Sequence, residues 1–184
     1  MRTRKFGSIL LCFAFFASSS LLAQQGAAAS THSGPMSMPK SSIDQLTLTS
    51  VVHPSVVLSA ADLKAIPHIT VTIHNTHTNV DETYFGVRLA DLLVKVEAPL
   101  GRELHGKALA YYIVATGSDG YAAVLAFGEV DPSFHPGEVL VADIMDGKPL
   151  DAHSGPFKLV VTEDKRPARS VRNLVSIELK MAAP

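Results

Sequence analysis

Hydrophobic and polar positions alternate over residues 46–52, the period-two pattern of a half-buried strand. A second strand is predicted at 69–73, and residues 74–83 that follow it are mostly polar. Leucines and a valine then recur with the spacing of one helix face, at Leu89, Leu92, Leu93 and Val96. We therefore expect the polar segment to be a loop between a strand and a helix, where binding groups commonly lie.

The rest of the chain predicts short strands separated by turns. Ser118-Asp119-Gly120 and Asp146-Gly147 are typical of hairpin turns. Ser59 and Asp62 have the spacing of a capping box, so a short helix should begin after Ser59 and stop before Pro67. Further strands are predicted at 108–115, 121–127, 139–144, 157–162 and 175–179. Many short strands with two or three helices indicate a single mixed α+β domain.

The N-terminal residues have the order of an export signal. Arg2, Arg4 and Lys5 precede a short apolar run, and small residues follow it, so residues 1–23 predict a Sec-type signal peptide. The apolar run is too short to cross a bilayer comfortably. Residues 24–45 are rich in Ala, Ser, Gly and Pro and predict a flexible linker, and residues 46–184 form the predicted domain. We expect a periplasmic or secreted protein with no membrane span after cleavage.

Composition excludes several kinds of chemistry. The only cysteine, Cys12, lies in the predicted signal, so the processed protein would have no thiol for a disulfide, an iron–sulfur cluster or a thiolate-bound metal. The formal net charge is −1, and removal of the signal's cations makes the chain more acidic. This balance argues against nucleic acid as a partner.

The polar segment contains the most specific local pattern, His74-x-x-His77. With Asp81 or Glu82 the two imidazoles could form a two-His-one-carboxylate metal site. Asn75 and its neighbours could instead contact a small molecule, or the segment could be a loop that satisfies its own backbone.

A second candidate region is basic. Lys165, Arg166, Arg169 and Arg172 lie within eight residues and could hold a phosphate or a carboxylate. A solvated charged loop is the alternative. Asp119 could orient a ligand or simply form the turn. Tyr121, which comes directly after this turn, is a further candidate for ligand binding.

Four blocks of sequence, at 86–93, 117–131, 139–150 and 155–179, resemble successive blocks of the oxidoreductase molybdopterin-binding domain, the central domain of sulfite-oxidase-type enzymes. The resemblance covers residues 46–179. It implies a mixed α+β fold with twisted, barrel-like sheets and a few short helices. It also implies that the basic segment, residues 165–172, lies near a pterin and its phosphate. Asp119-Gly120-Tyr121 matches a block of the same family.

The chain departs from the family at one functional position. Family enzymes bind molybdenum through a cysteine in the loop before the first block, and His74 or Asn75 falls near that position here. Imidazole is a poor substitute for thiolate on such a centre. We therefore expect an exported protein that binds a small anionic ligand, with molybdopterin possible but no cofactor expected. The alternatives are a molybdopterin-dependent oxidoreductase with a non-cysteine ligand such as His74, and a periplasmic module for a redox or transport partner.

Overall fold

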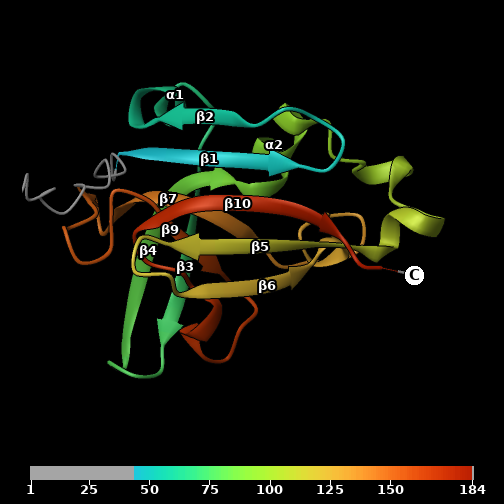
Figure 1. Cartoon of the computed structure of the whole chain (residues 1–184). Helices are drawn as coiled ribbons and strands as arrows, with labels where there is room; N and C mark the ends of the chain where they lie inside the picture. Colours follow the sequence, from blue (N-terminus) through green and yellow to red (C-terminus); the bar gives the residue numbers. More distant parts are fainter. Residues whose placement is uncertain (1–43, 184) are drawn as a thin grey trace, which may run out of the picture. The chain divides into compact units, whose positions relative to one another are not determined.

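The computed structural model describes residues 44–183, which form two five-stranded sheets (Figure 1). The first sheet contains the first and the last strand of the described chain, and these two strands pair in parallel. Its other neighbouring strands are antiparallel. Its strand order is β2-β1-β10-β5-β6, formed by Gln45–Ser50 (β1), Val56–Ser59 (β2), Tyr111–Gly117 (β5), Ala122–Ala126 (β6) and Leu174–Met181 (β10).

The second sheet is antiparallel throughout. Its path is β3-β4-β7-β8, and β9 also pairs with β7. The strands are Ile69–Asn75 (β3), Val80–Arg88 (β4), Val139–Met145 (β7), Lys148–Pro149 (β8) and Lys158–Val161 (β9). The predicted α+β class is confirmed, but within residues 44–183 the two sheets remain open and do not close into a barrel.

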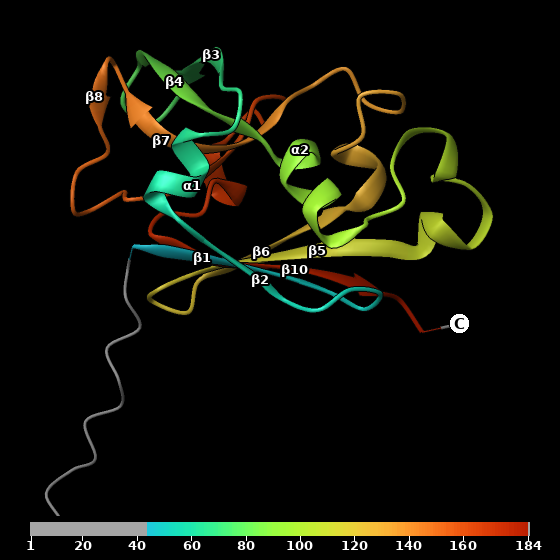
Figure 2. The same ribbon diagram turned by 90° about the horizontal axis from the view of Figure 1, so that it is seen from above.

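The helices are short. They are α1 (Ala60–Lys64), α2 (Leu89–Leu93) and the 3-10 turns η1 (Val94–Val96), η2 (Gly101–Glu103), η3 (Gly106–Ala110), η4 (Phe127–Glu129) and η5 (Pro167–Arg169). Figure 2 shows α1, α2 and the second sheet on the same side of the first sheet. The core between these elements contains fully buried side chains from both sheets and from α2, among them Leu48, Leu92, Ile113, Phe157 and Leu159.

The predicted capping box is confirmed. The Asp62 amide donates to Ser59 Oγ at 3.2 Å, and the Ser59 amide donates to the Asp62 carboxylate at 2.8 Å. These two bonds satisfy amides that have no partner within the first turn of a helix. The two predicted hairpin turns are also present, because β5 pairs with β6 and β7 pairs with β8.

The prediction that residues 74–83 form a loop is wrong. β3 continues to Asn75 and β4 begins at Val80, so only residues 76–79 form the turn of a hairpin. The alternation of apolar residues stops here because polar side chains pair across the two strands instead. His74 lies opposite Asp81, and the hydroxyls of Thr72 and Thr83 lie 3.1 Å apart. Cross-strand pairs of this kind stabilise a hairpin in place of apolar contacts.

The predicted signal peptide, and all of the predicted linker except its last two residues, lie outside the described residues. Those two assignments therefore stay predictions. In the part of the chain that is described, no helix has the length and apolar character needed to cross a membrane.

Gly86 marks a point where two strands of the second sheet come unusually close. The β4–β7 register shifts between Phe85 and Gly86, and a Cβ on Gly86 would lie 2.4 Å from the Val141 carbonyl oxygen. A side chain at this position therefore requires movement of the β7 backbone. Gly128 offers a matched control, since a Cβ there would meet no atom within 4 Å.

We predict that Gly86→Ala lowers the free energy of unfolding by about 1–3 kcal/mol, the usual cost of forcing extra volume into a packed site. Gly128→Ala should leave it unchanged or raise it slightly, because alanine restricts the unfolded chain. Urea denaturation of both variants measures the difference. Equal stability of the two variants would contradict the close approach.

Candidate functional site

A cavity of about 480 Å³ opens where three segments distant in sequence meet. These segments are the β3–β4 turn, the β5–β6 turn and the chain from β9 to β10. Both polar and apolar side chains face the cavity. Its lining residues are Asn75, His77, Asp119, Tyr121, Lys158, Pro167, Ala168, Ser170 and Arg172.

The cavity contains five of the nine residues predicted from the sequence to bind a ligand. These are Asn75, His77, Asp119, Tyr121 and Arg172. Lys165 and Arg166 lie on a neighbouring hollow, and His74 lies on another. The hairpin turn and the basic segment are thus side by side, as a shared site requires.

The wall formed by the β5–β6 turn rests directly on the chain that leads to β10. A Cβ on Gly117 would lie 2.6 Å from the Arg172 carbonyl oxygen, so only glycine permits this approach. The Ser118 amide donates to the Asn173 carbonyl at 2.9 Å. On the same wall, the Tyr121 hydroxyl donates to the Ala168 carbonyl. Together these contacts fix Arg172 and η5 relative to the turn.

Asn75 holds the shape of the β3–β4 turn. Its Oδ1 accepts from the amides of His77, at 3.0 Å, and Thr78, at 3.4 Å, and its Nδ2 donates to Glu82 at 2.7 Å. Asparagine commonly forms such side-chain turns. Because both ends of the amide are engaged, Asn75 positions His77 at the cavity.

Lys158 was missed by the sequence analysis. It lies on β9, with its Nζ 4.5 Å from the centroid of the Tyr84 ring and donating a hydrogen bond to the Tyr84 hydroxyl. That hydroxyl donates in turn to Glu82 at 2.6 Å. Burial lowers the pKa of Lys158, and the charge of Glu82 opposes this effect. Burial and the bond to Glu82 raise the pKa of Tyr84. The sequence does contain one signal that could have identified Lys158, namely a lysine within the otherwise largely apolar strand predicted at 157–162.

Two more groups complete the polar surface. The Arg172 guanidinium contacts the imidazole of His153, through Nη1 and Nε2. Ser170 Oγ is buried and has no hydrogen-bond partner among residues 44–183. A buried hydroxyl without a partner is costly. Sequence reasoning did not identify Ser170, and no local pattern distinguishes it.

The predicted metal set of His74, His77 and Asp81 is not assembled. His74 Nδ1 lies 2.7 Å from the Asp81 carboxylate, while His77 lines the cavity described above. Within residues 44–183, no three His, Cys, Asp or Glu side chains are arranged to hold a metal ion. The pair is separated because His74 and Asp81 face each other across the hairpin, whereas His77 lies in its turn.

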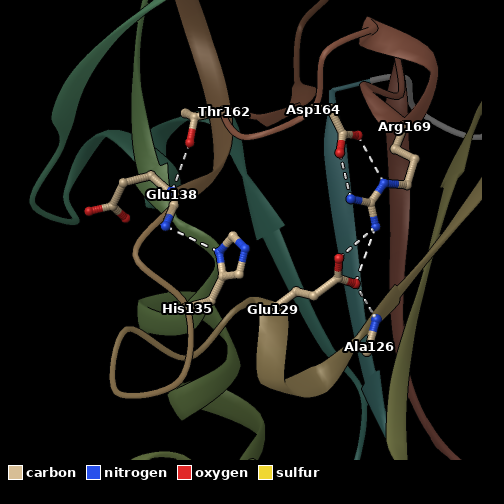
Figure 3. Close-up of polar contacts among 8 residues, drawn as sticks. Ala126, Glu129, His135, Glu138, Thr162, Asp164 and Arg169 are labelled. Atoms are coloured by element: carbon tan, nitrogen blue, oxygen red, sulfur yellow. Dashed lines mark hydrogen bonds and ion pairs between the residues drawn. The ribbon is translucent and has the colours of Figure 1, made fainter.

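The structure also separates Arg169 from the other predicted cations. Figure 3 shows its guanidinium between Asp164 and Glu129. Its Nη2 and Nε donate to Asp164 at 2.6 and 2.9 Å, and its Nη1 donates to Glu129 at 3.0 Å. Glu129 accepts in addition from the Ala126 amide at 2.7 Å. Arg169 therefore anchors η5 and does not face the cavity.

Comparison with known proteins agrees with this architecture. The crystal structure of the sulfane dehydrogenase SoxCD from Paracoccus pantotrophus matches with a TM-score of 0.57 and 18% sequence identity. The match covers 75% of this chain and 39% of that chain, so this chain spans well under half of it. The fold is thus of the sulfite-oxidase-like α+β class. No curated protein matches the sequence.

The family model described as the oxidoreductase molybdopterin binding domain matches residues 36–183. The chain belongs to this family. The cations of the cavity suit the anionic part of a molybdopterin, whereas the donors for its metal do not fit. The described residues contain no cysteine, and His74 is engaged with Asp81.

We predict that Arg169→Gln lowers the free energy of unfolding by about 1–2 kcal/mol, a modest value because the ion pairs are partly exposed. It should also speed hydrogen exchange of residues 164–170, since η5 loses its anchor. Arg102→Gln, on exposed η2, is the control and should have neither effect. An Arg169→Gln protein that matches the control in both measurements would show that the anchor is unimportant.

Proposed function

We propose that this protein binds a small anion in the cavity between the β3–β4 turn, the β5–β6 turn and η5. One observation carries the proposal: Lys158, on β9, and Arg172, just before β10, face the same cavity. Neither is paired with a carboxylate within 4 Å among the described residues. Two cations in one concave site attract an anion more strongly than either does alone.

The chemistry of the individual groups supports an oxyanion. Arg172 can donate two parallel hydrogen bonds, Lys158 adds a point charge, and Ser170 has a hydroxyl to donate. Partial burial removes water from the ammonium of Lys158 and lowers its pKa. A bound anion would stabilise its charged form. Asp119 opposes an anion, but its Oδ1 already accepts from the Tyr121 amide at 2.9 Å.

We infer further that the protein does not perform molybdenum chemistry. The family's metal position requires a thiolate, and the donors available near it are the imidazole of His74 and the amide of Asn75, both already hydrogen-bonded. A cavity with two cations, in a described chain that has no thiolate, is consistent with a binding role.

Sulfate is a suitable probe for the cavity. We expect Arg172→Gln and Lys158→Gln each to weaken sulfate binding roughly tenfold, since a charge-assisted hydrogen bond contributes about 1.5–3 kcal/mol and Arg172 is exposed to solvent. Isothermal titration calorimetry at low ionic strength measures the change. Arg102→Gln removes a cation outside the cavity and should bind as the unmodified protein does.

Sulfate affinity that is equal in Arg172→Gln and Arg102→Gln would contradict the proposed site. Stoichiometric molybdenum in protein purified from its native cell would contradict the second part of the proposal.

Sulfate affinity should also depend on pH through Lys158. The pKa of this lysine lies below its usual value of 10.5, so the ammonium loses its proton at a lower pH than an exposed lysine does. Since sulfate binds the protonated form, affinity should fall as the pH rises through that pKa. In Lys158→Arg the guanidinium stays charged, so the fall should be smaller. Titrations from neutral to alkaline pH test this, and parallel curves for both proteins would exclude Lys158 as the titrating group.

A further inference from the structure

A second hollow lies against the proposed anion cavity. Its volume is about 660 Å³. It shares His77, Pro167 and Ala168 with the first cavity, so these three residues form the divide between the two. The other residues that line it are Thr76, Lys165 and Arg166. A ligand longer than a simple oxyanion could therefore extend from one hollow into the other.

Each side of the divide has its own pair of cations. Lys158 and Arg172 face the first cavity, and Lys165 and Arg166 face the second. Among residues 44–183, neither Lys165 nor Arg166 forms an ion pair within 4 Å. Arg169, on the same segment, is paired with two carboxylates. Placing like charges near one another is unfavourable unless something of opposite charge lies between them.

The divide is held in place from both sides. Thr76 Oγ1 donates to the Lys165 carbonyl at 3.4 Å, and Tyr121 donates to the Ala168 carbonyl. Pro167 restricts the backbone between these contacts, and Arg169 anchors the end of η5. The backbone that carries Lys165 and Arg166 is therefore held beside the first cavity. Two of the three side chains of the divide, Pro167 and Ala168, are apolar, and the third is the imidazole of His77.

We propose that the ligand is an elongated molecule with two separate anionic groups and an apolar middle. One anionic group binds Lys158 and Arg172, the other binds Lys165 and Arg166, and the middle crosses Pro167 and Ala168. This inference rests on the proposed function, because the first group occupies the cavity described above. A molecule that engages both pairs gains from the high effective concentration of its second group.

The test uses a series of α,ω-alkane disulfonates of increasing length, each with the alkane monosulfonate of the same length as its control. Calorimetry measures both affinities. We expect the disulfonate of one intermediate length to bind at least about tenfold more tightly than its monosulfonate, because the tether makes the second contact intramolecular. Shorter and longer disulfonates should lose this advantage.

Variants of the two cation pairs locate the groups. Lys165→Gln with Arg166→Gln should abolish the advantage of the disulfonate and leave monosulfonate affinity unchanged, which also shows that the variant is folded. Arg172→Gln should weaken both ligands. A disulfonate advantage of no more than twofold at every length, with Arg172 still required, would overturn this inference and leave the proposed function standing. Failure of every sulfonate to bind the unmodified protein would overturn both.

Discussion

The pairing of Arg169 with Glu129 and Asp164 is the interaction on which the candidate site depends. Glu129 follows β6 in the first sheet, and Asp164 follows β9 in the second, so one guanidinium ties together segments from both sheets (Figure 3). η5 ends at Arg169 and forms the divide between two hollows. A planar group with several fixed donors suits this task better than an ammonium would. The ionic contacts of Arg169 hold the backbone of η5 in place. Among residues 44–183, the neighbouring cations Lys165, Arg166 and Arg172 form no ion pair within 4 Å.

Four cations close in sequence thus have three different environments. Arg169 is neutralised by carboxylates, Arg172 faces one hollow, and Lys165 and Arg166 face another. Composition cannot distinguish these environments, because the carboxylate of Glu129 lies 40 positions away from Arg169 along the chain. The same limit explains why Lys158 was overlooked. Its role follows from the Tyr84 ring beneath it, 74 positions away.

Helix caps and turns could be predicted from the sequence where both hydrogen-bonding groups lie close together along the chain. The capping box of Ser59 and Asp62 and the Asp146-Gly147 turn are confirmed for that reason, since backbone conformation and hydrogen bonds are decided within four residues. The α+β class followed from the order of the strands. The segment around His74 was misassigned because its strands are stabilised by polar pairs across a hairpin, and a period-two pattern of apolar residues is then absent.

That hairpin also bears on the relation between this chain and its family. On β3 the imidazole of His74 faces Asp81 on β4, and the amide of Asn75 bonds Glu82. Glu82 in turn accepts from Tyr84, which accepts from Lys158 at the cavity. Asn75, Glu82, Tyr84 and Lys158 thus form one chain of hydrogen bonds, and the His74–Asp81 pair is separate from it. A metal ligand at Asn75 would have to break this chain, and the partly buried ammonium of Lys158 would then lose part of its support. A ligand at His74 would have to break the pair with Asp81. His74 and Asn75 are thus both engaged within the hairpin, where polar pairs replace the apolar contacts that neighbouring strands usually make.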